Sequence, residues 1–454
     1  MKIRFALPLL TAAVLAAGCG DALEVGDLNN VPLDSLRSSS PSAATVNGAA
    51  TGLLVGTRVS MGAQNGYVSL LGIMGRESYN FDPADPRFIT EMLIGPLNGG
   101  SPAFGGNLFA NPYANIRVGN LILQAVPNTR GYSAQQMEAT RGFVKTIQAL
   151  DFLHVINTRG ANGAPIDVGG EERGALAPIA TEAQVYTHIL TLLDEAQTHL
   201  LAGGGAFPFR LSSGFTGFDT PATFLQVNRA LRARVSVYTG RYAEALTALG
   251  ASFVSTTQPL TLGAYHVFST RSGDIQNTLF DPSGRAILAH PSILTDAQPR
   301  AGGGIDLRAE TKVAPIEPRT VQGVTGAHVF TIYNSNLAPI PIIRNEELIL
   351  LRAEANIGLG QLGPALDDIN FIRTTSGGLP PYAGPVTQPA LLTELLYNKR
   401  YSLLFEGGHR WIDLRRYGLL GTLPRDLPTH EVFDRFPFPI GECDARQPDV
   451  PAGC

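Results

Sequence analysis

Two stretches of the chain repeat one helix-turn-helix pattern, and this repeat restricts the fold more than any other feature of the sequence. Residues 230–246 and 350–366 align at a constant offset of 120 residues, with six of the seventeen aligned positions identical. Gly240 and Gly360 coincide, and glycine ends a helix readily because it enters the left-handed conformation without steric cost. The alternative is a chance alignment of two unrelated amphipathic helices.

Helical periodicity dominates the rest of the chain. Leu348, Leu351 and Ala355 recur at steps of three and four residues, which places them on one face of a helix. Strand signals are confined to short stretches such as 329–333. Candidate helices cover residues 43–61, 113–126, 134–156, 181–201, 224–238, 243–249, 345–357, 364–373 and 389–405. The long polar loops are residues 98–107, 203–220 and 281–304. These loops are too many for a bare helical bundle, so the sequence predicts a mostly α protein with tetratricopeptide-like helix pairs and long loop and short-strand insertions.

The N-terminus has the pattern of a secretory signal peptide. Lys2 and Arg4 precede an apolar run over residues 5–17, which is shorter than the roughly 20 apolar residues that span a bilayer. Residues 16–18 are small and are followed by Cys19, an arrangement that resembles the lipobox of bacterial lipoproteins. The sequence therefore predicts a signal peptide over residues 1–18 and lipidation of Cys19.

The polar segment after this cysteine, residues 19–41, is predicted to be a partly flexible spacer. Residues 42–454 are then expected to form a single domain. Basic residues are scattered and number 34 against 38 acidic ones, which argues against nucleic acid as a partner. Cys443 and Cys454 remain as a candidate disulfide pair in an oxidising compartment.

The C-terminal third carries a chain of motifs that is specific enough to indicate a family. The motifs, in order, run through residues 344–355, 370–373 and 398–417, the last of them reading Asn-Lys-Arg-Tyr-Ser-Leu-Leu-Phe-Glu-Gly-Gly-His-Arg-Trp-Ile-Asp-Leu-Arg-Arg-Tyr. This order resembles the SusD/RagB family of nutrient-uptake lipoproteins, and weaker similarity extends back through residues 113–120. Gly408 departs from the family pattern as an extra residue.

The resemblance implies a SusD-like helical fold and a binding protein that is not an enzyme. Such a protein is anchored by its lipid in the outer membrane, faces the cell exterior, captures a glycan, an oligosaccharide or a peptide, and passes it to a TonB-dependent, SusC-like transporter. Two other functions stay open at this point. One is a helical-repeat scaffold lipoprotein for envelope protein assembly, and the other is a secreted hydrolase.

The charged residues of the motifs are expected to be structural. Opposite charges close together in sequence predict partly buried ion pairs that hold the last helix, with Trp411 in the core. The predicted structural set is Arg344, Glu347, Glu354, Arg400, Glu406, Arg410, Trp411, Asp413 and Arg415. A catalytic pair of Glu406 and Asp413 is disfavoured because each has an arginine nearby in sequence that would keep it ionised.

Ligand contacts are sought in loops that carry aromatic residues, since rings stack on sugar faces. The first candidate is the segment 67–88, with the predicted ligand-binding residues Tyr67, Arg76, Tyr79, Asn80, Phe81 and Asp82. The second candidate consists of Tyr265, His266, Phe268 and Arg271. The alternative for both segments is that their rings close the core.

Motifs of catalysis, phosphate binding and metal binding are missing from the sequence. The chain has no Gly-x-Ser-x-Gly, no His-Glu-x-x-His and no Gly-x-x-x-x-Gly-Lys motif. No cofactor and no metal site are predicted.

Overall fold

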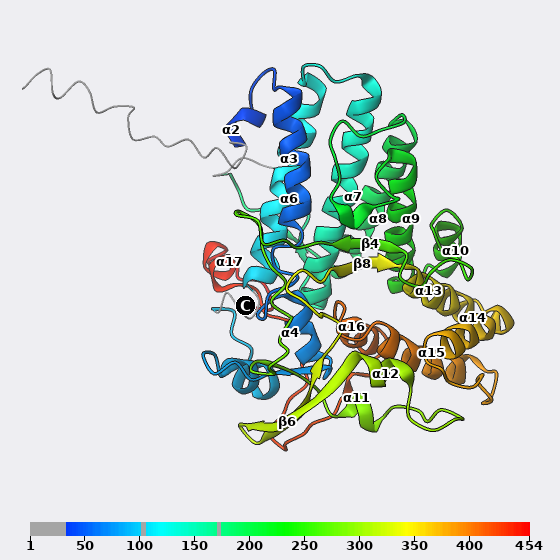
Figure 1. Cartoon of the computed structure of the whole chain (residues 1–454). Helices are drawn as coiled ribbons and strands as arrows, with labels where there is room; N and C mark the ends of the chain where they lie inside the picture. The colour runs from blue at the N-terminus through cyan, green and yellow to red at the C-terminus, as the bar shows by residue number, and fades with distance from the viewer. Residues whose placement is uncertain (1–32, 101–105, 170–173) are drawn as a thin grey trace, which may run out of the picture.

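Helices build most of the protein and stand in a curved array (Figure 1). The computed structural model describes residues 33–100, 106–169 and 174–454. The longer helices are α3 (Ala43–Gly56), α4 (Tyr67–Met74), α6 (Asn107–Ala125), α7 (Ala134–Arg159), α8 (Glu182–Leu201), α9 (Pro221–Tyr238), α10 (Tyr242–Gly250), α13 (Asn345–Gly358), α14 (Leu362–Thr375), α15 (Gln388–Ser402) and α16 (His409–Arg416). The short ones are α2 (Leu33–Leu36), α5 (Arg87–Ile89), α11 (Ser292–Thr295), α12 (Leu307–Lys312) and α17 (Ile440–Ala445). The predicted mostly α fold is confirmed.

Side-chain caps fix where the long central helices begin. Ser133 accepts a hydrogen bond from the backbone of Gln136, whose side chain bonds back to the backbone of Ser133 at the start of α7. Thr181 and Gln184 form the same reciprocal pair at the start of α8. Each pair satisfies two backbone donors that a helix N-terminus leaves free.

The repeated pattern forms two helix pairs that lie against each other. Helices α9 and α10 form the first pair and helices α13 and α14 the second, with α10 packed on α13. Gly240 and Gly360, which end the first helix of each pair, have φ angles of +69° and +72°, as the alignment predicts. A side chain at Gly358 would lie 2.2 Å from the ring of Tyr242, so this glycine lets the two pairs approach closely. The insertion between the copies therefore leaves their packing intact.

The strands form four small antiparallel pairs. These are β1 (Ser78–Asn80) with β5 (Ile287–Ala289), β2 (Ala164–Pro165) with β3 (Ile179–Ala180), β4 (Gly263–His266) with β8 (Ile340–Arg344), and β6 (Val313–Val321) with β7 (Val324–Phe330). Gln322 and Gly323 join β6 to β7, and both have positive φ angles, as a two-residue hairpin turn requires. The strand expected at residues 329–333 thus begins earlier, at Val324, and ends at Phe330.

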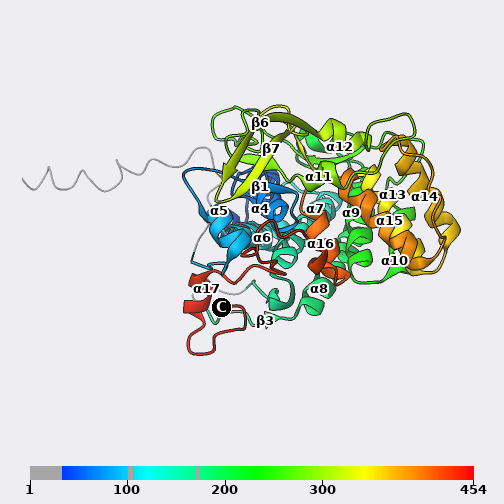
Figure 2. The same cartoon turned by 90° about the horizontal axis from the view of Figure 1, so that it is seen from below.

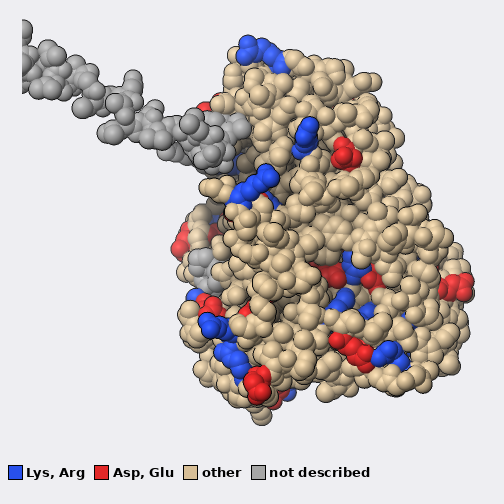
Figure 3. Space-filling view, in the orientation of Figure 1, with Lys and Arg blue, Asp and Glu red and all other residues tan. Residues whose placement is uncertain are grey.

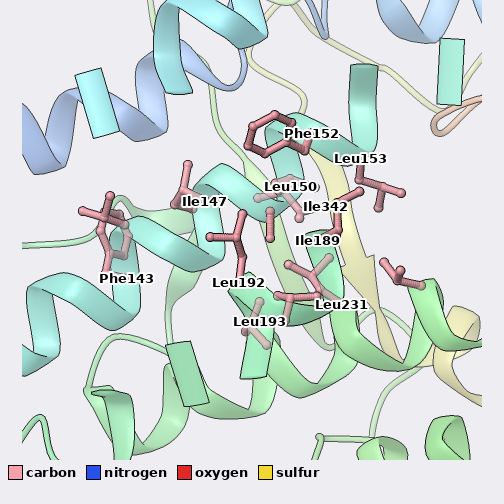
Figure 4. Packing of buried hydrophobic residues seen from close by; sticks show 14 of the residues in the cluster. Phe143, Ile147, Leu150, Phe152, Leu153, Ile189, Leu192, Leu193, Leu231 and Ile342 are labelled. Atoms are coloured by element: carbon pink, nitrogen blue, oxygen red, sulfur yellow. The ribbon is translucent and has the colours of Figure 1, made fainter. Parts of the chain in front are cut away.

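Three apolar clusters hold the elements together. The largest lies among helices α3, α6, α7, α8, α9 and α10, and Figure 4 shows Leu150, Leu193, Leu231 and their neighbours interlocking within it. A second cluster joins α4, the strands β1, β5, β6 and β7, and α16. A third one fills the space between α13, α14 and α15. Seen from below, the second helix pair lies on one side of the molecule, and α17 lies with the C-terminus on the opposite side (Figure 2).

The last part of the predicted spacer belongs to the folded body. Helix α2 packs against α3 and α6, and its Leu36 is buried in the largest cluster. The predicted signal peptide and Cys19 lie outside the described residues.

A buried carboxylate links three of the central helices. Asp151 on α7 accepts hydrogen bonds from Thr57 Oγ1 at the end of α3, at 2.6 Å, and from Asn115 Nδ2 on α6, at 2.8 Å. Burial raises the pKa of Asp151 to about 7, against the opposing effect of these two hydrogen bonds. The folded protein therefore binds a proton here that the unfolded chain releases at lower pH.

This proton makes a testable difference to stability. Because the pKa of Asp151 is higher in the folded than in the unfolded state, proton binding stabilises the fold. This stabilisation is complete at pH values below the ordinary pKa of an aspartate and is lost as the pH rises to about 7. In urea denaturation from pH 4 to 8, Asp151→Asn should remove up to about 4 kcal/mol of the fall in unfolding free energy. The exposed Asp367→Asn serves as the control, and equal pH slopes in the wild type and Asp151→Asn would contradict the assignment.

Candidate functional site

The first predicted ligand segment is part of the core. Tyr67 lies on α4, Tyr79 and Asn80 lie on β1, and the side chains of Tyr79 and Phe81 are each only 2% exposed. Residues two apart on a strand point to the same side, so these two rings stack on each other, with centroids 5.5 Å apart. Tyr79 also packs against His290. The expectation of an exposed aromatic platform in this segment is therefore wrong.

The polar members of this segment are also engaged inside the protein. Arg76 is 1% exposed and donates to the backbone carbonyls of Ile73, Pro424 and Glu431. Asn80 donates to the carbonyl of Gln64. The hydroxyl of Tyr67 accepts a hydrogen bond from Asn157, and Asp82, which is half-buried, accepts one from the backbone of Ala84. Hydrogen bonding explains their burial, because an unpaired polar group in the core would be costly.

The motif residues of the C-terminal third form a network of buried ion pairs. Arg344 contacts both oxygens of Glu406, at 2.8 and 2.9 Å, and pairs as well with Glu346. Glu347 contacts Arg234 of α9 through two hydrogen bonds, of 2.6 and 2.7 Å, which tie the two helix pairs together. Buried ion pairs are present, but Glu406 pairs with Arg344, 62 residues away, rather than with an arginine nearby in sequence as expected.

A second group of charges anchors α16. Glu354 lies 2.8 Å from Lys399 and 2.7 Å from Arg416, and both cations also contact Asp413. Burial raises the pKa of Glu354, but Arg416 and Lys399 outweigh this effect and lower it to about 2. Asp413 and Glu406 are thus held by cations in separate networks and do not form a pair of acid and base.

The remaining motif residues include the only tryptophan of the chain, and each makes contacts of its own. Trp411 is fully buried and donates from Nε1 to the carbonyl of Phe433 at 2.9 Å, while the guanidinium of Arg415 lies 4.5 Å from its ring centroid. Arg410 donates to the carbonyl of Arg76, and Arg400 pairs with Asp296. Gly408 has a φ angle of +73° at the start of α16, and a side chain there would lie 2.3 Å from Leu71. The extra residue is therefore a glycine that both the turn and the packing require.

An open cavity of about 510 Å³ lies beside strand β4. Its walls come from the C-terminal end of α3, from residues 210–215 with the short helix η5 (Ser213–Phe215), and from residues 265–274. Gly214 packs directly on the backbone of Tyr265, where an added side chain would meet the carbonyl oxygen at 1.9 Å. This glycine fixes the distance between two walls of the cavity.

All four residues of the second predicted segment line this cavity. Tyr265 is half-buried, Arg271 is exposed, and the side chains of His266 and Phe268 are buried in the wall. The hydroxyl of Tyr265 donates to the carbonyl of Thr261, which orients the ring. Burial, with a smaller contribution from the positive charge of Arg58, lowers the pKa of His266 well below its usual value, so this imidazole is neutral.

An ion pair holds the loop that forms one wall of the cavity. Arg58 of the α3 end pairs with Asp274 and lies over the ring of Phe268, 5.7 Å from its centroid. Burial raises the pKa of Asp274, but hydrogen bonds from Ser269 and Ile275 and the charge of Arg58 bring it below its usual value. The sequence pattern did not point to Arg58, because it lies more than 200 residues from the loop it holds.

Other cavities have features that make them weaker candidates. One of about 430 Å³ between α15 and α16 contains Arg400, which is already paired with Asp296. A void of about 30 Å³ contains His154, His266 and His409, and burial lowers the pKa of each of them. Within the part of the chain that the structure describes, no three His, Cys, Asp or Glu side chains are grouped so that they could hold a metal ion.

The C-terminal tail is closed by a covalent bond. Cys443 and Cys454, the pair suggested by the sequence, form a disulfide with Cα atoms 5.7 Å apart. The backbone nitrogen of Phe438 donates to the carbonyl of Gly453, so the closed tail lies against the end of the body.

The C-terminal region is similar to a known protein family. Residues 320–443, which contain most of the ion-pair network described above, match the model of the SusD family. For this region, the match confirms the resemblance to the SusD/RagB family that the sequence motifs indicate. At the sequence level, no curated protein matches the chain.

Solved structures show that the SusD-like fold extends over most of the chain. A SusD superfamily protein from Bacteroides vulgatus ATCC 8482 is 18% identical with a TM-score of 0.66, over 89% of this chain and 97% of that one. A laminarin-binding SusD-like protein is 17% identical with a TM-score of 0.65, over 90% and 99%. A putative sugar binding protein, also from B. vulgatus ATCC 8482, is 17% identical with a TM-score of 0.65, over 92% and 100%.

The difference in burial predicts a large loss of stability from a substitution in the first aromatic segment and a small loss in the second. Phe81→Ala should lower the unfolding free energy by about 3 to 5 kcal/mol, because it removes a fully buried ring and leaves a cavity. Tyr265→Ala should cost less than about 1 kcal/mol, since part of this ring faces solvent. Urea denaturation at one pH compares the two variants. A Phe81→Ala variant as stable as the wild type would mean that this ring lies outside the core.

Proposed function

We propose that the protein is a lipid-anchored, surface-exposed binding protein that captures glycans in the cavity beside β4 and passes them to a TonB-dependent transporter. The observation that carries this proposal is the cavity itself, which combines the half-buried ring of Tyr265 with hydroxyl and guanidinium groups on a SusD-like scaffold. Sugar recognition needs this combination, because apolar faces of a pyranose stack on rings while its hydroxyls form hydrogen bonds.

Three further features support a glycan ligand. Ser212 and Ser213 also line the cavity, and serine hydroxyls are short, adaptable donors and acceptors. The volume of about 510 Å³ lies in the range of ligand sites for small molecules. Structures of similar fold are described as laminarin binding and as a putative sugar binding protein.

The anchor and the transporter follow from the N-terminus and from the family. Among the described residues, no helix is long and apolar enough to cross a membrane. A lipid on Cys19 would supply the membrane attachment, and a coil of 14 residues, the number from Cys19 to the start of α2, would span roughly 20 Å. A membrane partner would then meet the body at high effective concentration.

Glycan binding is tested at the ring of Tyr265. Tyr265→Ala should weaken the binding of a captured oligosaccharide roughly tenfold, which corresponds to the loss of one stacking contact. Isothermal titration calorimetry measures the affinity after a glycan array on residues 20–454 has identified a ligand. Tyr382→Ala is the matched control, since Tyr382 is also half-buried and also donates to a nearby carbonyl, but lies outside the cavity. Equal affinity of Tyr265→Ala and the wild type would contradict the placement of the site.

Anchoring and transfer are tested together in the native membrane. Wild-type protein should incorporate labelled palmitate, fractionate with the outer membrane and co-purify with a β-barrel transporter in mild detergent. Cys19→Ser should appear in the soluble fraction and recover less transporter, because the tether has been lost. Pull-downs that recover periplasmic assembly factors and no barrel would favour an envelope scaffold instead.

A further inference from the structure

The cavity beside β4 is positively charged. Three arginines, Arg58, Arg210 and Arg271, line it together with a single carboxylate, Asp274, so its charged lining amounts to a net +2. The whole chain has a net charge of −4. In the space-filling view of Figure 3, basic side chains lie on the surface in the region of helix α3.

Two of these arginines have no side-chain partner among the described residues. Arg58 is paired with Asp274, which neutralises both groups. Arg210 and Arg271 are exposed, and their guanidinium groups make no ion pair or hydrogen bond with any side chain or carbonyl in the described ranges. In the motif network, by contrast, arginines such as Arg344 and Arg234 are held by carboxylates.

The two free guanidinium groups stand on different walls. Arg210 precedes η5 on one wall, and Arg271 lies in the loop after β4 on another. Gly214 packs on Tyr265 and holds these walls together, while Arg58 and Asp274 fix the loop of Arg271. A concave surface lined by one sign of charge attracts ligands of the opposite sign, and guanidinium groups bind carboxylates and sulfates through paired hydrogen bonds.

We propose that the ligand is an acidic glycan, whose carboxylate or sulfate groups contact Arg210 and Arg271 while a sugar ring lies on Tyr265. This inference rests on the proposed function and specifies its substrate class. The seryl hydroxyls beside the arginines and the partly open tyrosine ring favour a glycan over an acidic peptide.

The test compares ligands that differ only in charge. Calorimetry on residues 20–454 would use oligogalacturonate against its methyl ester, a sulfated galactan oligosaccharide against its desulfated form, and oligoglutamate as the peptide arm. The acidic form of at least one glycan pair should bind at least about tenfold more tightly than its neutral form, and this preference should shrink at 1 M salt, where charges are screened within about 3 Å. The two pairs distinguish carboxylate from sulfate.

Variants assign the preference to the two arginines. Arg210→Gln and Arg271→Gln should each weaken acidic binding about fivefold and leave neutral binding unchanged, and the double variant should abolish the preference. Arg130→Gln is the control, because Arg130 is exposed but lies outside the cavity. Tight binding of neutral glycans without this dependence would overturn the inference and leave the proposed function standing. Binding of oligoglutamate alone, or of no glycan, would overturn both.

Discussion

The buried ion pair between Arg344 and Glu406 joins the parts of the protein on which the cavity depends. Arg344 ends strand β8 and precedes α13, and its guanidinium reaches Glu406 and the carbonyl of Ser402 at the end of α15. Strand β8 in turn pairs with β4, which carries Tyr265. Removal of one partner from such a buried pair typically costs 3 to 5 kcal/mol, because the other charge remains desolvated. One interaction thus connects the helix stack, the last helices and a wall of the cavity.

The repeated helix pairs form the packed framework, and the insertion between them carries part of the cavity. Helices α9 and α10 pack on α13 and α14 as neighbouring repeats would, while the 120-residue offset between them accommodates β4, the loop 267–274 and the hairpin of β6 and β7. The charged contact of Arg234 with Glu347 keeps the two pairs in register across the insertion. Loops in the insertion can vary with little effect on the stack, since a contact between repeats needs only the helix faces.

Features set by neighbouring residues were predictable from the sequence, and features set by distant contacts were not. The starts of α7 and α8 follow from Ser133 and Thr181, whose partners lie three residues away. Helix α4 was missed because all its residues are buried, so its apolar run shows no periodicity. The rings of Tyr79 and Phe81 alternate as those of a half-exposed strand would, yet β5 and the second apolar cluster enclose them. At the cavity, Tyr265 and Arg271 were predicted as neighbours in sequence, whereas Arg58 and Arg210 join them only through tertiary packing.

Helix α3 connects the first described helix, α2, rigidly to the cavity. The chain enters the fold at α2, which is packed on α6, and α3 then runs for 14 residues to the point where its last turn and Arg58 form a wall of the cavity. This helix is about 20 Å long, and the packed clusters on its flank keep it from bending. The position of the cavity relative to α2 is therefore fixed by the folded body, and any movement of α2 would carry the cavity with it.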